Sequence, residues 1–131
     1  MQNVINGIRL SSTKGFEMES KLYFYNGIVK SIYDGDTIRI DVDLGFDTVI
    51  HNMKLRLSGI DTPEIRGDER PLGLIAKEFV VERIPVGSTI QIMTEKDATG
   101  KYGRYLATIF YDGGRNLNEE LVASGNAEIY E

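Results

Sequence analysis

The strongest constraint on the fold is a two-residue alternation that follows an Asp-Gly dipeptide. Between Ile38 and Leu44, apolar side chains occupy every second position, with charged residues between them. This period is typical of a β-strand with one buried face. The preceding run, Leu22–Tyr33, is rich in aromatic and β-branched residues, which favour strands. Asp34-Gly35 lies between the two runs and predicts a hairpin with a tight turn.

Three further strands and two helices are expected downstream of this hairpin. The strands are predicted at about Thr48–Ser58, Thr89–Glu95 and Tyr102–Tyr111. Pro71–Ile84 is predicted to be a helix with one apolar face. The residues that define this face are Leu72, Ile75, Ala76, Phe79, Val80 and Arg83.

The second helix has recognisable start and stop signals. Asn116 is expected to cap it, with Glu119 three residues on, and Gly125 to end it. Five strands, with one helix between the third and the fourth and a second helix after the fifth, predict a mainly β fold. It is a five-stranded OB-type Greek-key barrel with two or three packed α-helices. We expect residues 1–20 to form an N-terminal arm and residues 21–131 to form the domain.

Composition narrows the chemistry. The 131 residues include no cysteine and one histidine, His51, which we interpret as a surface residue. A metal site would therefore use oxygen ligands and suit a hard cation such as Ca²⁺ or Mg²⁺. The net charge of −5 argues against a strong, non-specific nucleic-acid binder. Without a long apolar stretch or a signal-like block, we expect a cytoplasmic location, with secretion after signal removal as the alternative.

Three short segments carry groups suited to chemistry: Asp34–Thr37, Leu55–Glu64 and Gly100–Arg104. Asp36 shares the parity of the apolar positions on its strand, and a lone carboxylate there is costly unless it is paired or bound to metal. Each segment has a structural explanation as well. The first can be only a hairpin turn, the second a capping run, and an arginine among aspartates a structural ion-pair network.

Taken together and in this order, the three segments resemble the staphylococcal-nuclease-like (thermonuclease) family. The resemblance covers about residues 23–127 and includes the helix around Asn118–Val122. It implies a Ca²⁺-dependent nuclease that hydrolyses phosphodiester bonds of DNA and/or RNA. A non-catalytic OB-type module that binds nucleic acid or protein is the alternative. We expect a monomer.

The resemblance also implies residue roles. Asp36, Asp61 and the backbone carbonyl of Thr62 would hold Ca²⁺. Glu64, three residues past Asp61, would act as general base on a water. Arg56 and Arg104 would grip the scissile phosphate with their forked donors.

Other positions are matched less well to the family. Lys101 and Tyr102 correspond to residues that contact a neighbouring phosphate. The chain differs from the best-known members near its C-terminus, where Tyr130 is out of step with the two tyrosines that line their nucleotide pocket. It also differs in its acidic net charge.

Overall fold

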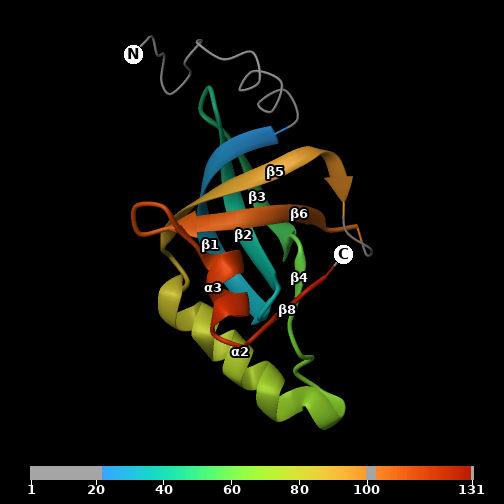
Figure 1. Ribbon diagram of the computed structural model, residues 1–131. Helices are drawn as coiled ribbons and strands as arrows, with labels where there is room; N and C mark the ends of the chain where they lie inside the picture. Colours follow the sequence, from blue (N-terminus) through green and yellow to red (C-terminus); the bar gives the residue numbers. More distant parts are fainter. Residues whose placement is uncertain (1–21, 100–102, 131) are drawn as a thin grey trace.

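Five long strands close into a barrel. The computed structural model describes residues 22–99 and 103–130 of the chain. The strands are β1 (Leu22–Asp34), β2 (Thr37–Gly45), β3 (Thr48–Leu57), β5 (Thr89–Thr99) and β6 (Tyr105–Tyr111). They pair antiparallel in the order β3-β2-β1-β5-β6, and a parallel pairing of β3 with β6 closes the cylinder (Figure 1). The predicted five-stranded OB-type barrel is confirmed.

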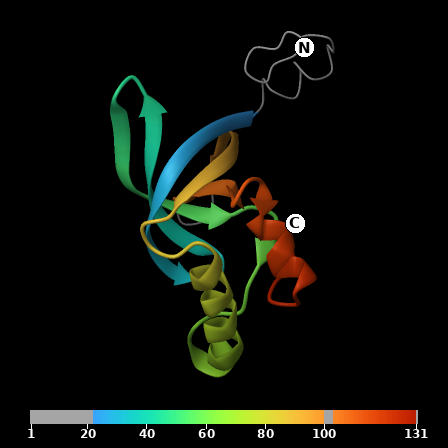
Figure 2. The same ribbon diagram turned by 90° about the vertical axis from the view of Figure 1, so that its left-hand side faces the viewer.

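Short elements surround the barrel. They are β4 (Ile60–Asp61), the 3-10 helix η1 (Gly67–Glu69), α2 (Arg70–Arg83), β7 (Arg115–Asn116), α3 (Leu117–Ala123) and β8 (Glu128–Ile129). Helix α2 lies below one end of the barrel in Figure 2, and α3 lies beside it. The two-residue strands β4 and β8 pair with each other and bring the end of the chain back to the barrel. Such short strands have no period that a sequence pattern can reveal.

The core confirms the alternation on β2. Ile38, Ile40 and Val42 are buried, and charged Arg39 and Asp41 between them are only partly exposed. Leucines and isoleucines from β3, β5, β6 and α3 complete the same cluster. This packed interior holds the strand ends in fixed positions. The polar groups at those ends are therefore presented by a rigid scaffold.

The β1–β2 turn differs by one residue from the prediction. Its two-residue loop is Gly35-Asp36, and Asp34 pairs with Thr37 as the last rung of the ladder. Gly35 is required for space, because a Cβ atom there would lie 2.8 Å from Thr62 Cγ2 and 3.0 Å from Ala76 Cβ. The hairpin end therefore packs directly against the segment after β4 and against α2.

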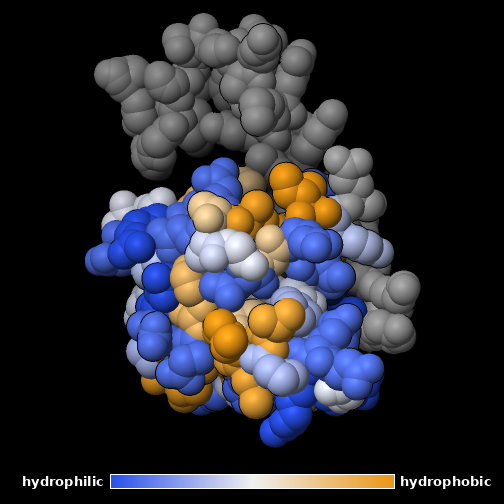
Figure 3. Space-filling model, turned by 60° about the horizontal axis from the view of Figure 1, so that its bottom comes forward, coloured by the Kyte–Doolittle hydropathy of each residue, from blue (hydrophilic) through white to orange (hydrophobic). Residues whose placement is uncertain are grey.

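The apolar face predicted for α2 is partly wrong. Leu72 and Ile75 are 60% and 56% exposed, whereas Gly73, Ala76 and Val80 are buried. The start of the helix approaches the backbone of Glu64 so closely that only small residues fit between them. The larger side chains consequently turn to solvent, and Figure 3 shows hydrophobic patches among hydrophilic surface at this end of the molecule.

Helix α3 begins and ends as predicted. The Asn116 side chain accepts a hydrogen bond of 3.0 Å from the Glu119 N–H, and Gly125 follows the helix with a φ of 84°. Within the described residues, no helix combines the length and the hydropathy that a membrane crossing requires. The predicted N-terminal arm, residues 1–20, lies outside the described residues.

Candidate active site

The predicted functional segments meet at one cleft of about 930 Å³ on the side of β1, β2 and β3. Five of the eight predicted site residues line it, namely Asp36, Arg56, Asp61, Glu64 and Arg104. Thr62 does not line the cleft; it is buried, and its N–H donates to Asp36. Lys101 and Tyr102 lie outside the described residues. The structure thus brings together groups that are up to 68 positions apart in the sequence, Asp36 and Arg104.

Asp36 is buried at the turn between β1 and β2, and both of its carboxylate oxygens have partners. One carboxylate oxygen accepts a 3.1 Å hydrogen bond from Thr37 Oγ1. The other accepts one of 3.1 Å from the backbone N–H of Thr62 and lies 3.3 Å from Arg56 Nη1. The prediction that this carboxylate faces the buried side and has a partner is confirmed.

Arg56 bridges two carboxylates. Its Nη2 donates to Asp61 Oδ1 at 3.1 Å, and its Nη1 donates to the Ile60 carbonyl at 3.0 Å while facing Asp36. The side chain is only 13% exposed. One guanidinium therefore serves two acidic groups, which leaves the cluster with an excess of negative charge.

Asp34 is a member of this cluster that the sequence reasoning missed. It is buried, and its Oδ1 accepts a 3.1 Å hydrogen bond from the Asp36 N–H. Burial, followed by the charge of Asp36, raises the pKa of Asp34 from 3.8 to about 7. Burial and the charge of Asp36 also raise the pKa of Asp61, although Arg56 acts in the opposite direction. The shared parity of Asp34 and Asp36 was the available signal for this site.

Arg104 approaches the acidic cluster from a different strand. It precedes β6, and its Nη1 donates a 2.9 Å hydrogen bond to Thr37 Oγ1, the hydroxyl that itself donates to Asp36. The parallel pairing of β3 with β6 sets Leu106 beside Arg56. Closure of the barrel is therefore what places the two predicted phosphate-binding arginines on one cleft.

Glu64 is held by its backbone and not by its side chain. Its N–H donates a 2.8 Å hydrogen bond to Glu69 Oε1, and a Cβ atom on Gly73 would come within 2.0 Å of its carbonyl oxygen. Among the described residues, no hydrogen bond or ion pair engages its exposed carboxylate. That carboxylate remains available to a water or a ligand in the cleft.

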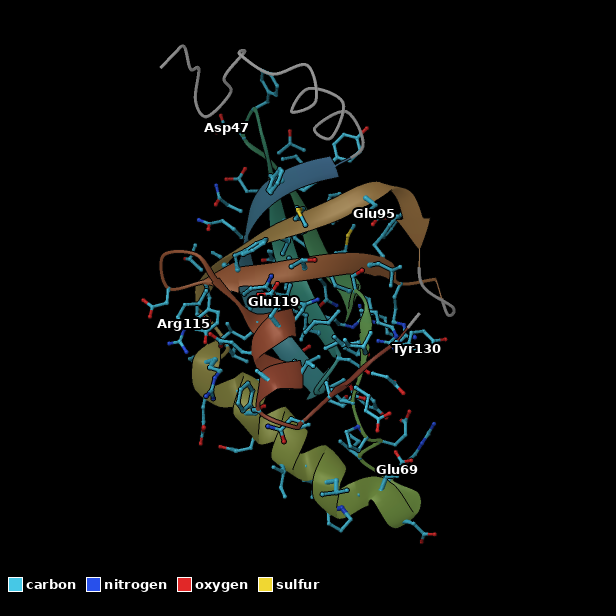
Figure 4. All side chains as sticks on the ribbon, in the orientation of Figure 1. Asp47, Glu69, Glu95, Arg115, Glu119 and Tyr130 are labelled. Carbon is cyan, nitrogen blue, oxygen red and sulfur yellow. The ribbon has the colours of Figure 1, made fainter. Side chains whose placement is uncertain are left out.

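Tyr130 enters the cleft through the pairing of β4 with β8. The Arg56 guanidinium carbon lies 5.4 Å from the centre of the Tyr130 ring. Figure 4 shows this tyrosine at the side of the barrel beside β4. No local pattern predicts the position, because it depends on the pairing of β8, which directly precedes Tyr130, with β4, which is remote in sequence.

The oxygen donors are of the kind that a hard cation binds, but their side chains alone are too few to surround one. Within residues 22–99 and 103–130, no three acidic or histidine side chains converge closely enough to hold a metal ion by themselves. Two aspartates with backbone carbonyls and waters are nevertheless ligands of the type that Ca²⁺ accepts. Among the described residues, the buried Thr62 hydroxyl has no hydrogen-bond partner.

Comparison with known proteins identifies relatives. Residues 54–131 match the profile described as "Staphylococcal nuclease homologue". An uncharacterized protein of Methanocaldococcus jannaschii is 33% identical over 132 residues, covering 82% of this chain and 60% of that protein. Endonuclease YhcR of Bacillus subtilis is 32% identical over 81% of this chain and 9% of its own length.

A thermonuclease of Staphylococcus intermedius is 33% identical over 76% of this chain and 56% of its own length. The chain therefore spans between about a tenth and three fifths of these relatives. The profile match covers more than half of the chain and includes the segments from Arg56 to Glu64 and around Arg104. The chain belongs to the family of staphylococcal nuclease homologues.

Proposed function

We propose that the protein is a Ca²⁺-dependent nuclease that hydrolyses phosphodiester bonds of DNA and/or RNA. One observation carries the proposal. Arg56 on β3 and Arg104 just before β6 line the same cleft as the buried Asp34 and Asp36 and an unengaged Glu64. Phosphodiester hydrolysis needs positive groups for the phosphate oxygens and a base for the attacking water. The cleft contains both.

The acidic cluster fits a divalent cation. Asp36, Asp61 and the backbone carbonyl of Thr62 would hold it, since oxygen donors of this kind suit Ca²⁺. Burial, followed by the charge of Asp36, raises the pKa of Asp34 and of Asp61, so negative charge is crowded at this cluster. When bound, the cation supplies Lewis-acid polarisation of the phosphate. Its positive charge would also remove the repulsion between these carboxylates.

The roles of the side chains follow from what each of them can donate or accept. Glu64 accepts a proton from the attacking water, because its carboxylate is exposed to the cleft and is not committed elsewhere. Arg56 and Arg104 donate hydrogen bonds to the non-bridging oxygens of the phosphate. These bonds strengthen as negative charge builds on the oxygens in the transition state. Arg56 contacts Asp36 and Asp61 as well, so its donors are divided between these aspartates and the substrate.

The alternative is a binding module that holds nucleic acid without cutting it. The contacts of Arg56 with Asp36 and Asp61 would suit a purely structural ion-pair network. Such a network gives no reason for an unengaged Glu64 beside it, nor for Arg104 on the same cleft. These two residues favour the enzyme.

The test compares cleavage by the parent and by two variants. Single-stranded DNA and RNA are incubated with the protein at low salt, first in EGTA and then in millimolar Ca²⁺. We expect cleavage only with Ca²⁺, and Glu64→Gln should slow it by more than ~100-fold. Glu78→Gln, which removes an exposed carboxylate on α2 outside the cleft, serves as the matched control and should cut at the parental rate.

Two results would contradict the proposal. Equal rates for Glu64→Gln and the parent would remove Glu64 from the mechanism. If the folded parent binds Ca²⁺ and cuts neither nucleic acid, the binding module becomes the better interpretation. Circular dichroism of each variant separates loss of chemistry from loss of fold.

A further inference from the structure

The cleft continues beyond the acidic cluster along the outer faces of β1, β2 and β3. Ser31, Tyr33, Arg39 and Lys54 line this continuation. Ser31 pairs with Arg39 between β1 and β2, and Arg39 pairs with Lys54 between β2 and β3. Ser31, Arg39 and Lys54 therefore form one row across three neighbouring strands, and Tyr33 lies two residues beyond Ser31 on β1. We call Tyr33, Arg39 and Lys54 the cationic extension.

The charges in this row are poorly compensated for a protein with a net charge of −5. Among the described residues, no acidic side chain pairs with Lys54 or Arg39, and Arg39 donates only to the Asn52 carbonyl at 2.9 Å. Nearby Lys30, by contrast, forms an ion pair with Asp41. Like charges directly opposite each other in a sheet are destabilising. An anion between Arg39 and Lys54 would relieve that repulsion.

The spacing of the row matches a polymeric anion. Lys54 lies two residues before Arg56 on the same face of β3, a separation of about 7 Å along the strand. Consecutive phosphates of one strand lie farther apart than the ~3.4 Å axial rise per nucleotide, because the backbone winds around that axis, so this separation suits adjacent phosphates. A phosphate held by Arg56 would thus leave a neighbouring phosphate within reach of Lys54 and Arg39.

Tyr33 adds an aromatic ring to the same cleft. Its side chain is 52% exposed at the end of β1, beside the acidic turn. An exposed ring next to backbone-binding cations is the arrangement that binds unpaired bases by stacking, with little preference for sequence. Bases within a duplex are already stacked on each other and do not offer a free face to such a ring.

We propose that the cationic extension binds the nucleotides that flank the scissile phosphate, and that these contacts strengthen binding of a strand whose flanking base is unpaired. The inference rests on the proposed nuclease function for its catalytic consequence. It assigns Arg39 and Lys54 to flanking phosphates and Tyr33 to a flanking base. These roles explain how an acidic protein can still hold a polyanion, because Arg39 and Lys54 add positive charge without acidic partners to the cleft.

The test compares a twelve-nucleotide single strand with a dinucleotide from the same sequence. Arg39→Gln and Lys54→Gln should each lower kcat/KM for the long strand roughly tenfold, as expected when a hydrogen bond to a charged group is lost. Their effect on the dinucleotide should be clearly smaller. Lys77→Gln makes the same change of charge on α2, away from the cleft, and should leave the ratio of the two kcat/KM values as in the parent.

A binding measurement keeps this inference distinct from the proposed function. Fluorescence anisotropy of the long strand in EGTA, over a range of salt, should give a salt slope that is smaller by about one in Lys54→Gln. Tyr33→Leu should weaken the single strand more than a duplex of the same length. Unchanged slopes, or an equal loss in Lys77→Gln, would overturn the cationic extension. Absence of cleavage by the parent would instead overturn the nuclease function, and the binding data would still decide the extension.

Discussion

Two charged clusters on opposite sides of the barrel differ in how their carboxylates are satisfied. The candidate active site contains Asp34, Asp36 and Asp61 around one arginine. The other cluster centres on Glu120 of α3. Figure 4 shows the separation, with Tyr130 at the candidate site and Arg115 beside the α3 cluster.

The α3 cluster is over-supplied with donors. Glu120 Oε1 accepts a hydrogen bond from the Tyr111 hydroxyl, and Oε2 accepts one of 2.8 Å from Arg115 Nε. Arg83 Nε lies 3.6 Å from the same carboxylate. Although partial burial opposes the effect, the donors Tyr111 and Arg115 hold the pKa of Glu120 below its ordinary range. This cluster fastens α3 to the barrel and requires no ligand.

The candidate site has fewer donors for its carboxylates than the α3 cluster has. Burial and the charge of Asp36 raise the pKa of Asp34 and Asp61. Both clusters contain arginine–carboxylate ion pairs, so the ion pairs alone do not distinguish them. Tyr111 and Arg115 hold the pKa of Glu120 low, whereas burial and the charge of Asp36 raise the pKa of Asp61 despite Arg56. Four predictions test this distinction.

The largest expected effect comes from replacing one arginine of each cluster by glutamine. Arg56→Gln should reduce the cleavage rate by ~10²–10³, because one set of donors to the phosphate is lost. Arg83→Gln should leave the rate within about twofold and instead lower the urea midpoint, since Arg83 contacts Glu120 and the Phe79 ring. Single-turnover cleavage and urea unfolding measure the two effects. Similar losses of activity in both variants would refute the contrast.

Gly73→Ala should displace Glu64 without changing any charge. The added Cβ would lie 2.0 Å from the Glu64 carbonyl oxygen and 2.5 Å from its carbon, so the backbone that carries Glu64 must shift. A displacement of about 1 Å at a catalytic group costs on the order of 100-fold in rate. Glu78→Ala, at an exposed position of the same helix, is the control. A parental rate in Gly73→Ala would show that the position of Glu64 is not critical.

Calcium should stabilise the parent through the candidate site alone. At a hundredfold excess over Kd, a ligand that binds only the folded state adds about 2.7 kcal/mol to the free energy of unfolding. Urea unfolding in EGTA and in Ca²⁺ measures this increment. It should shrink strongly in Asp61→Asn and persist in Glu120→Gln. Loss of the increment in both variants would mean that it reflects general charge screening.

The smallest effect is a difference in the sign of the pH dependence. In EGTA the raised pKa of Asp34 gives a stabilising contribution that is complete below about pH 4 and is lost as the pH rises through about 7. Asp34→Asn should abolish this loss. The Asn side chain can still accept the hydrogen bond from the Asp36 N–H.

Glu120 should behave in the opposite way. Its lowered pKa gives a contribution that is present above the ordinary glutamate pKa and is lost as the pH falls through the value in the folded state. Urea unfolding of Asp34→Asn, Glu120→Gln and the parent between pH 3 and 8 gives both slopes. If the two variants changed the profile in the same direction, the distinction between the clusters would be wrong.

Local patterns were sufficient to predict the barrel strands, the Asn116 cap and the burial of Asp36. Strand alternation and capping depend on neighbours within a few residues, so a sequence displays them directly. The same alternation put Arg56 on the outer face of β3, where the structure places it. The roles proposed for Glu64, Thr62 and the arginines remain predictions from family resemblance.

Long-range packing decided the rest. The exposure of Leu72 and Ile75 follows from the close approach of Gly73 to the Glu64 backbone, which no helical period encodes. The place of Tyr130 depends on the pairing of β4 with β8, and the shared cleft of Arg56 and Arg104 depends on the pairing of β3 with β6. The raised pKa of Asp34 needs both burial and a neighbouring charge. Each of these properties arises between segments that are remote along the chain, and only the closed barrel brings those segments into contact.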